Sequence, residues 1–125
     1  SKFALQGISE VMRSEMAPFG VHVTTLCPGS FRTDWAGRSM VRTERSIADY
    51  DSLFDPIREA RQAVSGKQLG DPDKLAAAVL MLVDSTNPPP QLLLGSDAFK
   101  HVSAKLERLQ QEINAWKSVT FSTDG

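Results

Sequence analysis

Few residues of this sequence have types and spacing that suggest chemistry, and most of them lie in its first third. Lys2 places an ammonium group at the start of an apolar, helix-like segment. Pro28 and Gly29 follow a run rich in β-branched residues, and Thr33 adds a hydroxyl shortly afterwards. An ammonium stabilises a nearby anion, and a glycine allows the backbone to approach a flat ring. Taken singly, these features are more typical of an exposed lysine and an ordinary turn.

The remaining candidate residues have simpler structural interpretations. His22 and His101 lack partners at metal-ligand spacing, so no metal site is expected. Cys27 is the only cysteine, which excludes an internal disulfide and any multi-cysteine metal site. It is interpreted as an inert thiol at the end of a strand. A single cysteine fits a reducing, cytoplasmic setting.

Length and composition are those of one globular domain. The 125 residues are 41% hydrophobic and 23% charged. The formal net charge of -1 gives no overall field that would attract nucleic acid or an anionic membrane. The most apolar run, LAAAVLMLV at 75–83, is far shorter than the roughly 20 residues of a membrane-spanning helix. We therefore expect neither nucleic acid nor a membrane as a partner.

Periodicity and turn residues predict the elements that hold the first group of side chains. Apolar residues recur at three- and four-residue steps through 2–16, which predicts a helix that Pro18 and Gly20 end. Residues 21–27 (VHVTTLC) predict a strand. The segment 30–70 has loose patterning, which is typical of a long functional loop.

The second half of the chain continues this alternation. A short helix is predicted over 56–64, and a longer one over 72–83 with Asp71 as its N-cap. Three prolines then lead into a short strand over 92–94. This order of strand, loop, helix and strand predicts a βαβ crossover with parallel strands, and so the α/β class.

The last part of the sequence predicts a long amphipathic helix. Ser96 or Asp97 is expected to cap a helix over 97–116, and residues 117–125 resemble a tail. Residues 1–116 are expected to form part of a single domain. Two parallel strands alone would leave both of their outer edges unpaired, and parallel sheets normally have helices on both faces. We therefore expect this chain to form the end of a larger sheet.

These residues together carry a resemblance to a known family. The run SKFALQGISEVMRSEMAPFGVHVTTLCPGSFRTD resembles the short-chain dehydrogenase/reductase family, from within its Tyr-x-x-x-Lys motif to just past its Pro-Gly-x-x-x-Thr motif. Lys2 falls on the lysine of the first motif, and Pro28, Gly29 and Thr33 fall on the second. The later run GKQLGDPDKLAAAVLMLVD is similar to the family's next helix.

The resemblance implies a fold and a missing complement of residues. The fold is a Rossmann-like doubly wound parallel sheet, of which this chain holds the last two strands and the flanking helices. The family's tyrosine, serine, asparagine and glycine-rich cofactor turn would precede Ser1. By this expectation the chain alone is a fragment without activity, whereas the complete protein transfers hydride between a nicotinamide and a carbonyl or secondary alcohol.

The resemblance also implies roles for individual residues. Lys2 is the expected catalytic residue, because an ammonium ~4 Å from a phenolate contributes about 4 kcal/mol at an effective dielectric of about 20, or roughly three pKa units. NAD or NADP is the expected cofactor, with no preference readable. The expected cofactor-binding residues are Lys2, Pro28, Gly29, Ser30, Phe31 and Thr33.

The loop offers weaker candidates with two interpretations each. Trp35 and Met40 would line an apolar substrate pocket or anchor the loop on the core. Its basic residues would suit an acidic ligand, but a solvated charged loop is the simpler interpretation. These basic residues are Arg32, Arg38, Arg42 and Arg45.

The apolar stripe of the last helix allows more than one partner and an alternative function. LLLGSDAFKHVSAKLERLQQEINAW is similar to a family subgroup with a strand and a long helix. Its apolar stripe would pack on the protein's own substrate region or on a second subunit, and a homo-oligomer is expected. The alternative function is a truncated, non-catalytic helical interaction module. Another Rossmann-type enzyme, such as a methyltransferase, is disfavoured by the joint placement of Lys2, Pro28-Gly29 and Thr33.

Overall fold

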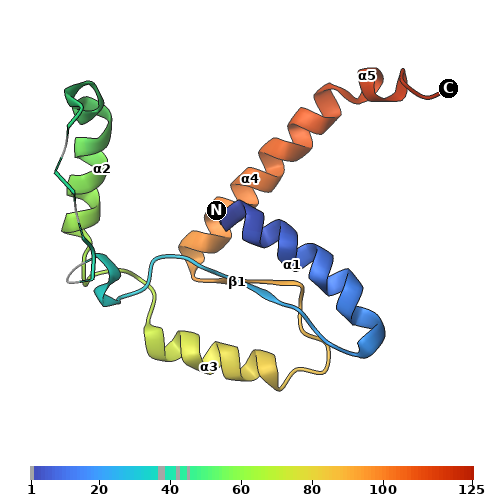
Figure 1. The fold of residues 1–125 in the computed structure, drawn as a ribbon, viewed down its shortest axis with the longest axis horizontal. Helices are drawn as coiled ribbons and strands as arrows, with labels where there is room; N and C mark the ends of the chain where they lie inside the picture. Colours follow the sequence, from blue (N-terminus) through green and yellow to red (C-terminus); the bar gives the residue numbers. More distant parts are fainter. Residues whose placement is uncertain (1, 37–38, 42, 45) are drawn as a thin grey trace.

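The computed structural model describes residues 2–36, 39–41, 43–44 and 46–125, and its architecture is α/β (Figure 1). Strands β1 (Thr25–Pro28) and β2 (Gln91–Leu94) form a parallel pair. Thr25 lies opposite Gln91, and Pro28 lies opposite Leu94. Both strands therefore end at the same edge, where the Pro28-Gly29 turn begins. The predicted βαβ crossover with parallel strands is confirmed.

Helix α1 spans Lys2–Met16, as the apolar periodicity predicted. A short 3-10 turn, η1 (Ala17–Phe19), ends it, and Gly20 adopts the left-handed conformation with φ of 71°. Glycine occupies such conformations without a steric penalty, so the chain reverses here and returns toward the sheet. This places Lys2 back at the edge where β1 ends (Figure 1).

The strand predicted over 21–27 is wrong at its start, because β1 pairs only over Thr25–Pro28. The residues that precede β2 are prolines, which have no N–H to donate to a ladder. The carbonyls there still accept hydrogen bonds. The Thr24 hydroxyl donates to the carbonyl of Pro89 at 2.7 Å, and the Thr25 amide donates to that of Pro90 at 3.0 Å.

In its described residues, the crossover between the strands contains two helices and two 3-10 turns. The turns are η2 (Asp34–Ala36) and η3 (Ala48–Tyr50), and α2 spans Asp51–Ala63. The predicted helix over 56–64 therefore starts earlier, with Pro56 inside it. Pro56 lacks an N–H and so cannot donate to the helical ladder at this position.

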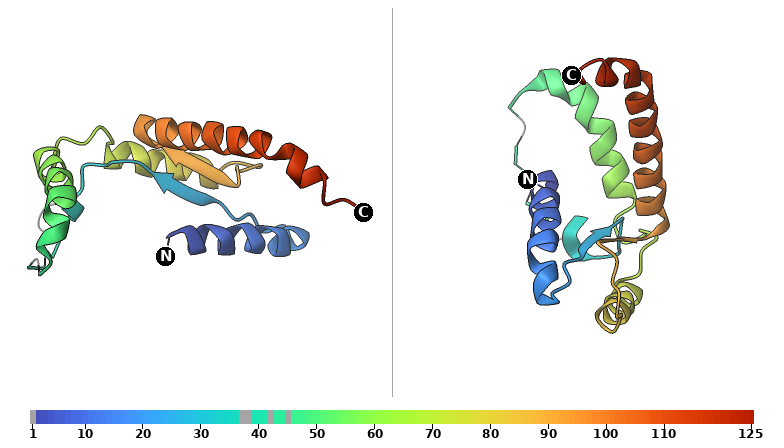
Figure 2. Two further views of the ribbon diagram at one scale, coloured as in Figure 1. Left: turned by 90° about the horizontal axis from the view of Figure 1, so that it is seen from above. Right: turned by 90° about the vertical axis from the view of Figure 1, so that its right-hand side faces the viewer.

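Helix α3 spans Pro72–Val83, as predicted. The Asp71 side chain accepts a hydrogen bond from the amide of Asp73 at 3.0 Å, which confirms the predicted N-cap. Helices α1 and α3 lie on opposite sides of the strand pair (Figures 1 and 2). One helix thus lies on each side of the strand pair, the arrangement typical of parallel strands.

Helix α4 (Ser96–Ala115) follows β2 directly, and α5 (Lys117–Phe121) occupies part of the expected tail. The predicted cap is wrong. Gly95 is the N-cap residue, with φ of 103°, and its neighbours Ser96 and Asp97 belong to the first turn. Asp97 is not free to cap the helix, because its carboxylate contacts a loop far away in the sequence.

Burial is concentrated at one junction. Among the described residues only Leu94, at the end of β2, and Ala98, in the first turn of α4, are buried. The apolar faces of the helices remain largely exposed; on α1, for example, Ile8 is 56% exposed. Within the described part of the chain, no helix combines the length and apolar character needed to cross a bilayer.

Candidate functional site

The loop that follows β1 borders a cavity of about 530 Å³, here called the loop cavity. Five of the residues predicted to bind the cofactor line it together: Pro28, Gly29, Ser30, Phe31 and Thr33. Trp35, a predicted substrate residue, also lines it, whereas Met40 does not. The carboxyl end of the strands thus gathers residues that the motif had only spaced along the chain.

The opposite wall of the loop cavity comes from residues that sequence reasoning missed. They are Arg61 and Val64 at the end of α2, Gln68 in the following turn, and Leu75 in α3. The side-chain oxygen of Gln68 is buried and has no hydrogen-bond partner among the described residues. No local motif distinguished these residues, because the crossover alone brings α2 against the loop.

Lys2 lines a second and larger cavity, of about 760 Å³, here called the helix cavity. It lies between α1, β1 and α4, and most of its lining is apolar: Phe3, Leu5, Leu26, Val102, Leu106 and Leu109. Pro28 lines both cavities. The cavity that Lys2 lines and the cavity that the loop lines therefore share the last residue of β1.

A set of backbone hydrogen bonds holds the loop against the start of α3. The amide of Gly70 donates to the carbonyl of Ser30, and the amide of Arg32 donates to the carbonyl of Gly70, both at 3.0 Å. A Cβ on Gly70 would lie 2.6 Å from the ring of Phe31. Only glycine therefore permits this close approach.

The Arg32 side chain strengthens the same attachment. Its guanidinium donates to the carbonyl of Gln68 at 2.9 Å and pairs with the Asp71 carboxylate at 3.0 Å. Arg32 is thus engaged within the protein rather than held free for an acidic ligand. The other basic loop residues, Arg38, Arg42 and Arg45, lie outside the described residues.

The loop is also attached to the start of α4, through Asp97. The amide of Ser30 donates to the Asp97 carboxylate at 2.7 Å. This hydrogen bond is the main reason why the pKa of the Asp97 carboxyl lies below its ordinary value, and slight desolvation opposes it. The amide of Gly29 donates to the carbonyl of Leu94 at 2.8 Å. We call the bonds that join residues 29–32 to Gly70, Asp71, Leu94 and Asp97 the loop network.

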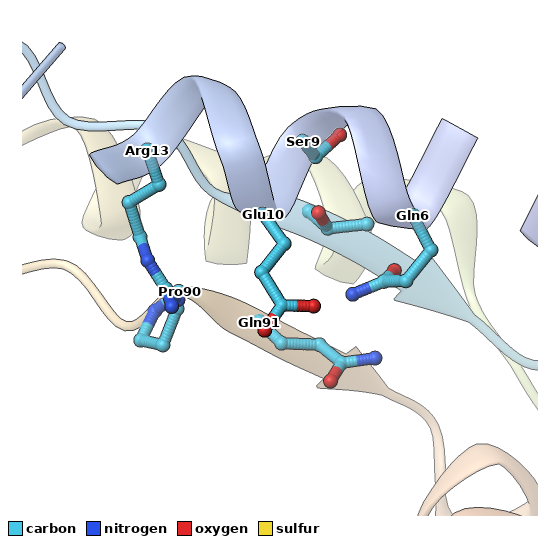
Figure 3. A pocket seen from close by; sticks show the side chains of 7 residues that line it. Gln6, Ser9, Glu10, Arg13, Pro90 and Gln91 are labelled. Carbon is cyan, nitrogen blue, oxygen red and sulfur yellow. The ribbon is translucent and has the colours of Figure 1, made fainter. Parts of the chain in front are cut away.

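A third, smaller cavity of about 140 Å³ lies away from this region. Figure 3 shows Gln6, Glu10 and Arg13 of α1 extending toward Pro90 and Gln91 at the start of β2. Its lining is polar and includes none of the predicted site residues. Within the described ranges, no three histidine, cysteine or acidic side chains lie close enough together to hold a metal ion.

The chain is similar to oxidoreductases over nearly its whole length. No protein-family profile matches it. An oxidoreductase of Botryotinia fuckeliana is 32% identical over 123 residues, which is 98% of this chain and 44% of that protein. A 3-ketodihydrosphingosine reductase of Bacteroides thetaiotaomicron is 33% identical over 91 residues, 71% of this chain and 33% of that protein.

A solved structure matches the fold as well as the sequence. A short-chain dehydrogenase from Streptomyces avermitilis superimposes with a TM-score of 0.80 and 35% sequence identity, over 98% of this chain and 44% of that one. The chain thus spans less than half the length of the proteins it matches. The predicted fold, the last part of a Rossmann-like sheet with its flanking helices, is confirmed.

Proposed function

We propose that this chain, whose sequence and fold match the carboxy-terminal part of short-chain dehydrogenase/reductases, supplies one wall of the nicotinamide site in an NAD(P)-dependent oxidoreductase. The observation that carries the proposal is that Pro28 lines both cavities. This shared residue supports a single site at the carboxyl end of β1, with Lys2 on one side of it and the Pro-Gly loop on the other. Ligands of open α/β sheets bind at this edge.

The loop cavity has the chemistry that a nicotinamide ring needs. Pro28 and Phe31 give it apolar walls, and the lack of a side chain at Gly29 leaves the backbone open to close approach. Among the described residues, none accepts a hydrogen bond from the amide of Phe31. That amide and the hydroxyl of Thr33 are the groups proposed to bind the carboxamide.

Lys2 is proposed to act on a proton rather than on the hydride. A bound nicotinamide supplies or accepts the hydride, and the substrate oxygen must gain or lose a proton at the same time. A tyrosine is a reluctant base, because the unperturbed pKa of a phenol is about 10. The ammonium of Lys2 lowers that pKa by stabilising the phenolate, and it also binds the ribose hydroxyls.

The tyrosine that Lys2 would assist is proposed to come from the rest of the protein. Tyr50 is the only tyrosine of the sequence, and it lines neither cavity. The 125 residues alone are therefore proposed to lack turnover. General acid and base catalysis contributes about 10² to 10⁴ in rate, so its loss would leave little activity.

The substrate is proposed to be a carbonyl compound or a secondary alcohol with an apolar body. Trp35, Val64 and Leu75 line the loop cavity and give it apolar surface. One relative is, by its name, a reductase of a keto compound, 3-ketodihydrosphingosine.

The complete protein is further proposed to be a homo-oligomer, since the exposed apolar residues of α1 need a covering surface. A cytoplasmic location is proposed as well.

The test is hydride transfer by the full-length protein. NADH or NADPH oxidation would be followed spectrophotometrically with a panel of ketones and aldehydes, for the wild type and for Lys2→Met. We expect the wild type to turn over and kcat to fall by about 10² to 10⁴ in the variant. Lys100→Met is the matched control, because Lys100 is exposed on α4 and lines neither cavity.

Two outcomes would contradict the proposal. The first is a full-length wild type that binds neither dinucleotide. The second is a Lys2→Met variant with the kcat of the Lys100→Met control, because a lysine at the site must affect turnover more than a solvated one.

A further inference from the structure

We infer that Asp97 is a positioning residue, which sets the backbone of the Pro-Gly loop for the nicotinamide from the first turn of α4. The inference rests on the proposed function, because it concerns the same loop cavity. Asp97 itself does not line that cavity. It acts through Ser30, whose amide it binds at 2.7 Å.

The Asp97 carboxylate bridges the loop and the helix. One oxygen accepts the hydrogen bond from the Ser30 amide, and the other accepts a hydrogen bond from the amide of Ala98 at 2.9 Å. A hydrogen bond to a charged acceptor is stronger than one between neutral groups. Because Ala98 is one of the two buried residues, the carboxylate ties the loop to the best-packed point of the structure.

Two glycines leave room for the carboxylate beside the loop. A Cβ added to Gly29 would collide with the Asp97 carboxylate, and one added to Gly95 would lie 2.8 Å from its Oδ1. The amide of Gly29 donates to the carbonyl of Leu94 at 2.8 Å. The two successive amides, of Gly29 and Ser30, are therefore both held by the β2–α4 segment.

This attachment decides which loop groups remain for a ligand. The Ser30 amide is bound to Asp97, and the Ser30 carbonyl is bound to the amide of Gly70. The next donor along the chain is the Phe31 amide, which shares a planar peptide unit with the Ser30 carbonyl. Asp97 fixes the preceding peptide unit through the Ser30 amide, so the two bonds together set the φ and ψ angles of Ser30 and with them the direction of the Phe31 amide. If the Ser30 amide loses its charged partner, Gly70 alone holds this segment, and the direction of the Phe31 amide is less restricted.

A helix-capping role alone does not require this contact. Asp73 occupies the second position of α3, as Asp97 does in α4, and both gain from the positive end of a helix dipole. The side chain of Asp73 makes no hydrogen bond or ion pair with any residue that the structure describes. Asp73 therefore provides a matched control with the same charge and helix position but no loop contact.

The experiment compares two ligands on the full-length protein. Equilibrium titrations would measure Kd for the dinucleotide that the wild type prefers and for the matching ADP-ribose, which lacks the nicotinamide. For Asp97→Asn we expect the dinucleotide Kd to rise about three- to tenfold, since a neutral acceptor binds the Ser30 amide more weakly. The Kd of ADP-ribose should change less than about twofold, and Asp73→Asn should change neither.

Each other outcome overturns one of the two proposals. Equal losses for both ligands, or no loss for either, would show that Asp97 is merely structural. A wild type that binds neither ligand would instead overturn the proposed function. Should Asp97→Asn fail to fold, as judged by circular dichroism, Asp97→Glu tests the same contact, because the longer side chain keeps the negative charge at the start of α4 but moves the carboxylate out of register with the Ser30 amide. The same selective loss is expected, and an unselective one overturns the inference.

Discussion

The two cavities meet at Pro28, yet they are built in opposite ways. The loop cavity is held by the loop network, in which hydrogen bonds of 2.7–3.0 Å join residues 29–32 to the starts of α3 and α4. The helix cavity has few polar contacts, and its apolar walls are exposed; Leu106 is 59% exposed. The proposed cofactor loop is thus held by contacts within this chain, whereas the position of Lys2 depends on what covers α1 and α4.

The largest expected effect concerns the helix cavity. The 125-residue chain expressed alone should show no cooperative thermal transition, because Leu94 and Ala98 are the only buried residues among those described, and in the described part of the chain each strand has a single neighbour. Circular dichroism and gel filtration would measure this, with the full-length protein as the control. A cooperative melt from a defined oligomer would favour the alternative of a helical interaction module.

Substituting one glycine in each region should change the free energy of unfolding in opposite directions, by a smaller amount. Gly70→Ala should lower the free energy of unfolding of the full-length protein by about 1–3 kcal/mol, since its Cβ would lie 2.6 Å from Phe31 and 2.7 Å from the Ser30 carbonyl oxygen. Gly7→Ala, on α1, meets nothing within 4 Å and should raise it by about 0.5–1 kcal/mol. Denaturant unfolding would measure both free energies. If both substitutions changed the free energy of unfolding in the same direction, the contrast between the tightly held loop and the open helix face would be wrong.

The attachment of the loop to α3 should contribute less. Asp71→Ala removes both the N-cap of α3 and the partner of Arg32, so we expect a loss of about 1 kcal/mol, most of it from the cap. The ion pair adds little, because both side chains are about one-third or more exposed, at 40% and 34%. Asp73→Ala is the control. An equal loss in that variant would mean that helix charge alone is responsible.

The smallest effect is a pH dependence of the attachment to α4. Hydrogen bonding lowers the pKa of Asp97 in the folded protein, so its contribution is fully present above the unfolded pKa of about 3.9. It is lost as the pH falls through the lower folded pKa. Between about pH 5 and pH 3, the wild type should therefore lose more stability than Asp97→Asn. Parallel losses in urea titrations would contradict this assignment.

Local signals in the sequence were sufficient for several elements. The helix over 2–16 follows from apolar periodicity and from the proline and glycine that end it. The Asp71 cap depends on contacts within one turn, so it too was predictable. Residues of the segment 28–33 line one cavity, as expected for a motif that directly follows the end of a single strand.

Other features depended on partners distant in the sequence. The predicted strand over 21–27 pairs only from Thr25 onward, because the prolines before β2 have no backbone N–H to donate to it. Asp97 was interpreted as a cap because its partner, Ser30, lies 67 residues away. The contacts of Arg32 with the turn before α3 likewise cross the whole loop, so composition alone placed that arginine in a solvated patch.

The sequence by itself therefore determined the elements, the parallel pair and the segment that forms the loop after β1, because each depends on neighbours a few positions apart. Only the tertiary structure decided how the loop is held. Hydrogen bonds to Gly70 and Asp97 form when the crossover brings the starts of α3 and α4 beside β1, and their formation requires distances that no local pattern encodes.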